Sequence, residues 1–174
     1  DLLKKTVAGS LVIGLVASLC ITLAGVLGLH PLLLMLDTPA EILDDAYRYI
    51  LTIDLGVLVM FAYNLCAGLL RAIGNSVMPL VFLLISSGLN VVLDLLFIAR
   101  MGMGVQGAAV ATVLSRYTET AIVVIWAHTH EKENTYMTGL YKTLSVPRDH
   151  VKKYFIKGTP LLLNEALWSF GMAV

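Results

Sequence analysis

Two polar side chains lie four residues apart inside a long apolar run. The run covers residues 77–99 and holds Asn90 and Asp94, and the next apolar run, 107–127, carries Thr112 near its start. A carboxylate, an amide oxygen and a hydroxyl are hard oxygen ligands that suit Na⁺. Alternatively, Asp94 holds a proton, because burial away from water favours the neutral acid. An acid inside an apolar segment of this length is costly and marks a functional site by default. We therefore expect a cation- or proton-binding site here, with a neutral packing role for Asp94 as the alternative.

Two further acids interrupt apolar runs. Asp54 lies in the run 46–70, and it either joins the same interior or is an interfacial residue near Arg48 and Tyr49. Glu165 follows Asn164 in the last apolar run. It is a second proton or cation site, or it forms a hydrogen bond between helices. Asp54 and Glu165 are thus possible second acidic sites.

The elements that position these residues are four apolar runs, each long enough to cross a bilayer as a helix. They cover residues 6–36, 46–70, 77–99 and 107–127, and a fifth begins near Tyr154 and continues to Val174. We expect the first run to be one tilted span broken near His30 and Pro31. The chain is 58% hydrophobic and only 14% charged, well below the quarter that is usual in soluble domains. This pattern predicts an all-α, polytopic transmembrane helix bundle with four full spans and the start of a fifth.

The turn between the third and fourth runs is short and rich in glycine, so these two helices should be antiparallel neighbours. Asp94 lies five residues before the end of the third run, and Thr112 lies five residues after the start of the fourth run. Both of these ends belong to the same side of the membrane. At 1.5 Å per residue, each of the two residues is about 8 Å deep. We therefore expect the two side chains at one level in the membrane, with Asn90 one turn deeper.

The fourth run carries two local patterns. Gly107, Ala111 and Ser115 recur at four-residue spacing, a stripe that allows close approach of a neighbouring helix. Arg116 and Glu119 lie three residues apart, and we expect them to form a structural ion pair.

The distribution of basic residues predicts the orientation. With the N-terminus inside, nine Lys and Arg residues flank the spans on the inner side, against Arg48 and Arg100 on the outer side. This excess places the N-terminus in the cytoplasm. We expect a multi-pass protein of the inner (plasma) membrane. No signal peptide is recognised, and the start at Asp1 leads us to expect part of a longer protein.

Several function classes are disfavoured by composition and motifs. The net charge is zero, which gives no reason to expect nucleic acid as a partner. There is no HExxH motif, no paired-carboxylate motif and no nucleophile with a base, so we do not expect an enzyme. We expect no cofactor beyond Na⁺ or H⁺ as a coupling ion.

Four strings, in this order and spacing, resemble the MATE family, the multidrug and toxic compound extrusion transporters. They are GLLRAIGNSxxP (68–79), NxxxD (90–94), GVQGAAVAT (104–112) and GTPLLLNEALWSFG (158–171). The resemblance implies part of a twelve-helix transporter with two lobes. Residues 1–130 would be four helices of the N-terminal lobe, 131–153 a cytoplasmic linker between lobes, and 154–174 the start of the first helix of the C-terminal lobe.

The resemblance also implies a function and a site. One branch of that family binds a cation or proton with an Asp on helix one, an Asn and an Asp on helix five and a Thr on helix six. Asn90, Asp94 and Thr112 match the last three, and the helix-one Asp lies outside this sequence. Other branches use a Glu on helix seven, and Glu165 is near that place.

The implied activity is efflux of drugs or organic cations by antiport against Na⁺ or H⁺. The full-length protein is expected to be a monomer in contact with membrane lipid. A flippase for lipids or lipid-linked oligosaccharides of the same superfamily stays open, and so does a non-transporting membrane fragment.

Overall fold

Helices make up all of the regular structure that the computed structural model describes. The described residues are 2–130 and, beyond them, 152, 156, 158–160, 163–165, 167, 168 and 171. The elements in chain order are α1 (Leu2–Met35), α2 (Ala40–Leu55), α3 (Val57–Ala72), α4 (Val77–Asp94), the π-helix η1 (Leu95–Arg100) and α5 (Gly104–Thr129). None of the described residues forms a strand, so the predicted all-α class is confirmed.

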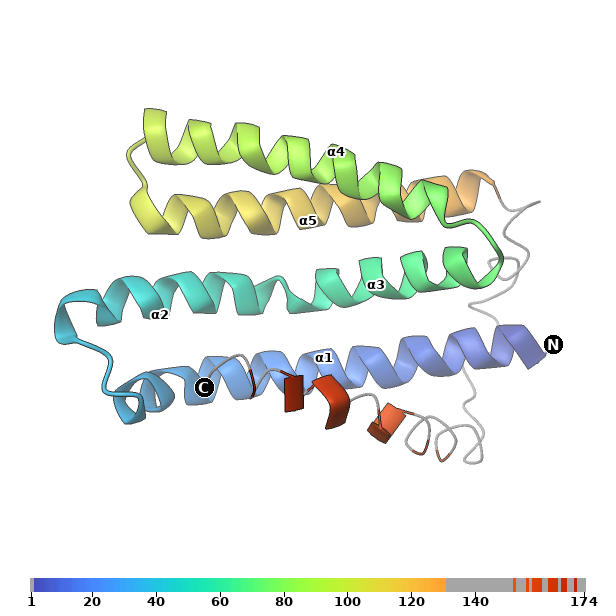
Figure 1. Cartoon of the computed structure of the whole chain (residues 1–174), viewed down its shortest axis with the longest axis horizontal. Coiled ribbons are helices and arrows are strands. Elements are labelled where there is room, and N and C mark those ends of the chain that lie inside the picture. The colour runs from blue at the N-terminus through green and yellow to red at the C-terminus, as the bar shows by residue number, and fades with distance from the viewer. Residues whose placement is uncertain are drawn as a thin grey trace.

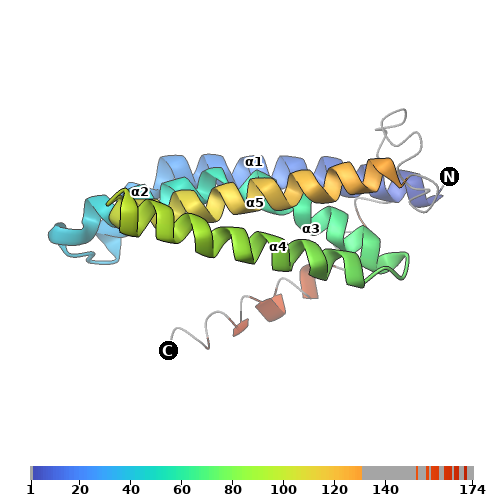
Figure 2. The same ribbon diagram turned by 90° about the horizontal axis from the view of Figure 1, so that it is seen from above.

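The helices run back and forth along one long axis, as Figure 1 shows. Four rows lie in the spatial order α1, α2 with α3, α5 and α4, and the view from above in Figure 2 shows the shared axis. Helix α5 contacts α2, α3 and α4, whereas α1 packs on α2 and α3. Two ends result, and we call the end with the start of α1 the inner end and the opposite end the outer end, following the predicted orientation.

Three of the described helical segments are long and apolar enough to cross a membrane. They are Thr6–Met35, Val77–Arg100 and Gly104–Thr129. Helices α2 and α3 supply a fourth span if they are taken together, and they meet at an angle of 41°. The predicted membrane bundle is therefore confirmed over this part of the chain.

Helix α1 continues through Pro31 to Met35, so the expected break near His30 and Pro31 is wrong. The proline ring removes one backbone N–H donor, but it does so in the last turns of the helix, where few bonds remain to be lost. The chain turns only after Met35, where Asp37 adopts a positive φ of 50°.

The second span is broken at Gly56, between α2 and α3. The Gly56 N–H bonds to the Ile53 carbonyl at 2.9 Å, and the Thr22 hydroxyl of α1 donates to the Asp54 carbonyl at 3.3 Å. The Asp54 carbonyl also accepts a backbone N–H at the end of α2. The backbone at the break is therefore hydrogen-bonded both within the chain and to a neighbouring helix, as an apolar environment requires. A Cβ added at Gly56 would lie 3.2 Å from Val113 of α5, so the glycine also lets α5 approach the break closely.

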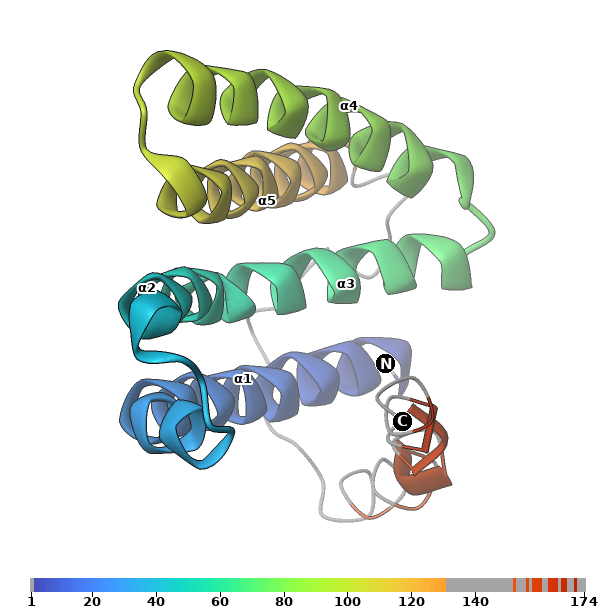
Figure 3. The same ribbon diagram turned by 60° about the vertical axis from the view of Figure 1, so that its left-hand side comes forward.

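Tight packing is concentrated toward the inner end. One buried cluster joins α3, α4 and α5, and a smaller one joins the start of α1 to the end of α5; the two clusters are Tyr63, Ala67, Leu70, Phe82 and Val123, and Val7, Ala8 and Ala127. By contrast, α2 and η1 contain no buried residue. In Figure 3, α4 and α5 lie above α2 and α3, with α1 below.

Beyond residue 151 the structure describes only isolated positions and runs of two or three residues, and all of these are helical. Of the predicted linker, residues 131–153, only Lys152 is among them. The predicted division into two lobes and a linker stays a prediction.

Candidate functional site

Asn90 and Asp94 lie on one face of α4, one turn apart, as their spacing predicted. Both residues are half-buried. Asp94 Oδ1 and Asn90 Nδ2 are buried atoms that have no hydrogen-bond partner. A buried polar atom without a partner is unfavourable and requires an explanation, such as a bound ion or proton.

A π-helix begins directly after Asp94. Helix α4 ends at Asp94, and η1 covers Leu95–Arg100. The wider turn closes with bonds from the N–H of Met101 to the Leu96 carbonyl at 3.0 Å and from Met103 to Phe97 at 2.9 Å. Such π-helical turns are rare and often lie at functional sites. The apolar sequence here contains no glycine or proline, so no signal in it could have predicted this turn.

Two contacts set the register between α4 and α5. The Ser86 hydroxyl donates to the Ser115 carbonyl at 3.1 Å near the inner end, and a Cβ on Gly107 would lie 3.1 Å from Phe97 Cβ near the outer end. Thr112 lies between these contacts. Counting about 1.5 Å per residue from either contact places Thr112 within about 3 Å of the level of Asn90.

The same count places Asp94 about 3–8 Å farther out than Thr112, compared with the single shared level that was predicted. The prediction assumed that the fourth span starts at Gly107, whereas α5 starts at Gly104 and so carries Thr112 deeper. No hydrogen bond joins any two of Asn90, Asp94 and Thr112. The structure brings the three residues to one seam between adjacent helices, and it does not bond them to one another.

This donor set fits a small cation or a proton. Asp94 offers a buried carboxylate oxygen, and the half-buried Thr112 hydroxyl lies on the neighbouring helix. The buried amide atom of Asn90 is its nitrogen, which cannot bind a cation. Rotating the side-chain amide by 180° would put its oxygen in the same place. Carboxylate, amide and hydroxyl oxygens suit Na⁺, and a proton on Asp94 would neutralise it equally well.

Asp54 lies toward the interior of the helix pair. Its Oδ2 atom is buried and has no partner, and its carboxylate lies over Gly25 of α1, where an added Cβ would overlap it. Arg48 pairs with Asp44 at 3.0 Å instead. The Asp54 carboxylate therefore lies between α1 and α2, not beside Asp94 on α4, and its role as a second acidic site stays a prediction. Glu165 is helical and exposed, and its role stays a prediction.

The predicted pair between Arg116 and Glu119 is present. Arg116 Nη1 lies 2.6 Å from Glu119 Oε2. The Glu119 side chain is completely buried, and its Oε1 atom has no partner. The Tyr63 hydroxyl of α3 lies within electrostatic range of this pair and donates to the Pro79 carbonyl at 3.1 Å. The pair therefore belongs to the packed inner half, as a structural role requires.

The small-residue stripe on α5 allows close helix packing, as predicted. Gly107 lies against Phe97, the Ser115 carbonyl accepts from Ser86, and Gly107, Ala111 and Ser115 are all buried.

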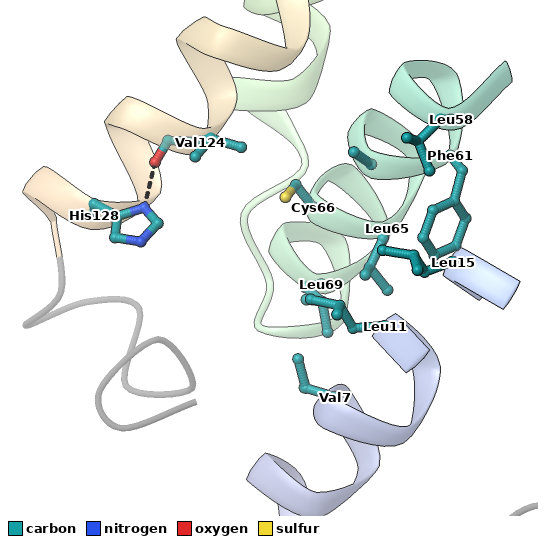
Figure 4. A pocket seen from close by; sticks show the side chains of 11 residues that line it. Val7, Leu11, Leu15, Leu58, Phe61, Leu65, Cys66, Leu69, Val124 and His128 are labelled. Atoms are coloured by element: carbon teal, nitrogen blue, oxygen red, sulfur yellow. Dashed lines mark hydrogen bonds between the residues drawn. The ribbon is translucent and has the colours of Figure 1, made fainter. Parts of the chain in front are cut away.

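A small apolar cavity of about 230 Å³ lies between α1, α3 and α5. Figure 4 shows Phe61 and Leu65 from α3 facing Leu11 and Leu15 from α1. On the α5 side, His128 Nδ1 bonds to the Val124 carbonyl at 2.8 Å. This volume is below the roughly 300–1,000 Å³ of drug-sized sites, and no acid lines the cavity. It is therefore a weaker candidate than the seam between α4 and α5.

Comparison with known proteins identifies the family. Residues 1–96 match the MatE family, a segment that includes Asn90 and Asp94. The chain belongs to the MatE family. The predicted resemblance is thereby confirmed, and with it the assignment as a multi-pass membrane protein.

Individual MatE relatives are similar over parts of their length. The probable multidrug resistance protein YpnP of Bacillus subtilis (strain 168) is 41% identical over 85 residues, which are 49% of this chain and 19% of that protein. The probable multidrug resistance protein NorM of Bacillus licheniformis is 30% identical over 121 residues, or 69% of this chain and 27% of that protein. A crystal structure of a MATE protein in complex with MaD3S superposes with a TM-score of 0.87 and 27% identity, covering 97% of this chain and 38% of that one. The chain thus spans well under half the length of these MatE relatives.

Proposed function

We propose that the full-length protein is a secondary antiporter that exports organic cations or other drugs in exchange for Na⁺ or H⁺. Its family and the names of its relatives support multidrug transport. The observation that supports ion coupling is the buried, unpartnered pair of atoms at Asn90 and Asp94, next to a π-helical turn. We place the protein in the plasma membrane as a monomer, with the start of α1 facing the cytoplasm.

In this mechanism, Asp94 is the group whose charge changes. A cation or proton bound at Asp94 removes the unpaired negative charge, with Asn90 and Thr112 supplying further polar contacts along the seam. Binding at this seam between α4 and α5 would favour one arrangement of the two helices over another. Such differential binding is what allows an ion gradient to drive alternating access.

The test uses the full-length protein reconstituted in vesicles. Either a Na⁺ gradient or a pH gradient is imposed, and efflux of a fluorescent organic cation is followed. We expect gradient-driven efflux in the wild type and none above empty vesicles in Asp94→Asn, because the amide has the same shape but cannot bind a proton or carry a charge. Asp44→Asn is the matched control, since Asp44 is an exposed acid paired with Arg48 on the surface.

Three results are informative. The gradient that drives efflux identifies the coupling ion. Normal efflux by folded Asp94→Asn would show that Asp94 is not the coupling residue. No efflux under either gradient from folded wild-type protein would contradict the antiporter and support the flippase.

A further inference from the structure

The second unexplained acid lies at the break in the second span. Asp54 belongs to the last turn of α2, directly before Leu55 and the break at Gly56. Its Oδ2 atom is buried and unpartnered. The same oxygen is the nearest atom to a Cβ added at Gly25 of α1. A glycine at this position is therefore what leaves room for the carboxylate between the two helices.

The backbone beside this carboxylate is polar. The Thr22 hydroxyl of α1 donates to the backbone carbonyl of Asp54 at 3.3 Å, and the last turn of α2 is a helix C-terminus, which carries partial negative charge. In membrane transporters, the C-terminal ends of broken helices commonly coordinate cations. A hollow of about 430 Å³ between α1 and α2 reaches Asp54. It is lined otherwise by apolar residues and glycines of the two helices.

No positive side chain is available to balance Asp54 from the elements packed around it. Residues 6–35 of α1 contain no charged residue. On α2 itself, Arg48 pairs with Asp44. On α5, Arg116 pairs with Glu119, and Gln106 donates to Thr52 at 2.7 Å. On α3, the only basic residue is Arg71, in its last turn and far from the break.

An unpaired carboxylate in this environment would be strongly unfavourable, because burial without a partner penalises the charge. We propose that Asp54 binds one monovalent cation, either Na⁺ or a proton, in the hollow between α1 and α2 at the C-terminal end of α2. A single acid balances one positive charge, so a divalent ion is disfavoured. This site is separate from the one at Asp94, and it does not require Asp94 to be the coupling residue.

The first experiment measures cation binding by the purified full-length protein in lipid nanodiscs. Binding of radioactive Na⁺ is counted at equilibrium, and the infrared band of protonated carboxyl groups is recorded in parallel. If the ion is Na⁺, Asp54→Asn loses one equivalent of bound Na⁺. If the ion is a proton, Na⁺ binding is unchanged and Asp54→Asn loses a protonated-carboxyl band instead. Asp44→Asn, which removes an exposed acid from the same helix, should change neither signal. If Asp54→Asn also changes neither signal, the proposal is wrong.

A matched pair of glycine variants tests the geometry without removing the acid. Gly25→Ala places a methyl group where the carboxylate lies, whereas Gly28→Ala, one turn along the same hollow, meets nothing within 4 Å. We expect Gly25→Ala to remove the signal assigned to Asp54, and Gly28→Ala to preserve it. Equal effects of the two variants would contradict the proposed site. The thermal stability of each variant in the same nanodiscs shows whether it is folded.

Asp94→Asn separates this proposal from the proposed transport function. If the signal lost in Asp54→Asn persists in Asp94→Asn, the two sites are distinct. If Asp94→Asn abolishes that signal as well, a separate site at Asp54 is refuted.

Discussion

Removing Arg116 should destabilise the protein strongly, because it would leave a buried acid without its partner. In the Arg116–Glu119 pair, the Glu119 side chain is 0% exposed and the Arg116 side chain is 34% exposed. Breaking a buried pair by deleting one partner usually costs about 3–5 kcal/mol. Because a third of Arg116 is exposed, water screens part of the interaction, so we expect Arg116→Ala to lower the free energy of unfolding by about 2–4 kcal/mol.

The chain contains its own control for this prediction. Arg48 and Asp44 form an ion pair at 3.0 Å, but their side chains are 64% and 73% exposed. An exposed pair contributes about 0–1 kcal/mol, so Arg48→Ala should change stability little. The difference between the two arginine variants therefore measures the effect of burying the acid.

The assay is reversible unfolding of the full-length protein by SDS in bicelles, followed by circular dichroism. We expect Arg116→Ala combined with Glu119→Gln to recover most of the loss, since the amide keeps the volume of the acid and removes its charge. The coupling between the two changes then gives the interaction energy. The reasoning is refuted if Arg116→Ala destabilises the protein no more than Arg48→Ala does.

Two further predictions concern packing toward the two ends of the bundle. Gly107→Val should destabilise the fold by about 1–3 kcal/mol more than Gly88→Val, because a Cβ at Gly107 lies 3.1 Å from Phe97 Cβ whereas one at Gly88 meets nothing within 4 Å. The same unfolding assay checks this, and equal losses would show that α4 and η1 can shift away from α5. Tyr63→Phe should cost about 1 kcal/mol, because the hydroxyl donates to the Pro79 carbonyl at 3.1 Å. A loss below measurement error would mean that this bond adds nothing to the packing of α3 against α4.

Much of the fold could be predicted because span length and hydropathy are local properties of the chain. The lengths of the apolar runs indicated four membrane-crossing segments, and the four-residue spacing of Asn90 and Asp94 placed them on one helix face. The three-residue spacing of Arg116 and Glu119 likewise indicated their ion pair. Each of these features depends only on helical geometry, which the sequence reports directly.

Other features depend on contacts between helices that are distant in the sequence. The run 95–100 has no helix-breaking residue, yet it forms a π-helix where it lies against the start of α5. The depth of Thr112 depended on where α5 begins. Pro31, which usually ends or kinks a helix, lies within α1.

The sequence by itself determined which segments cross the membrane and which acids lie within them. Asp54 and Asp94 are recognisable from their positions in apolar runs alone. Only the tertiary structure decided which of their oxygen atoms lack a hydrogen-bond partner, because the available partners are side chains on neighbouring helices. Asp54 lies over Gly25, a residue almost thirty positions earlier, whereas Glu119 meets Arg116 on its own helix. The charge of Glu119 is balanced by an arginine on its own helix, although its Oε1 atom has no partner. Among the described residues, Asp54 and Asp94 have no such cation beside them, and for this reason we propose them, and not Glu119, as ion-binding groups.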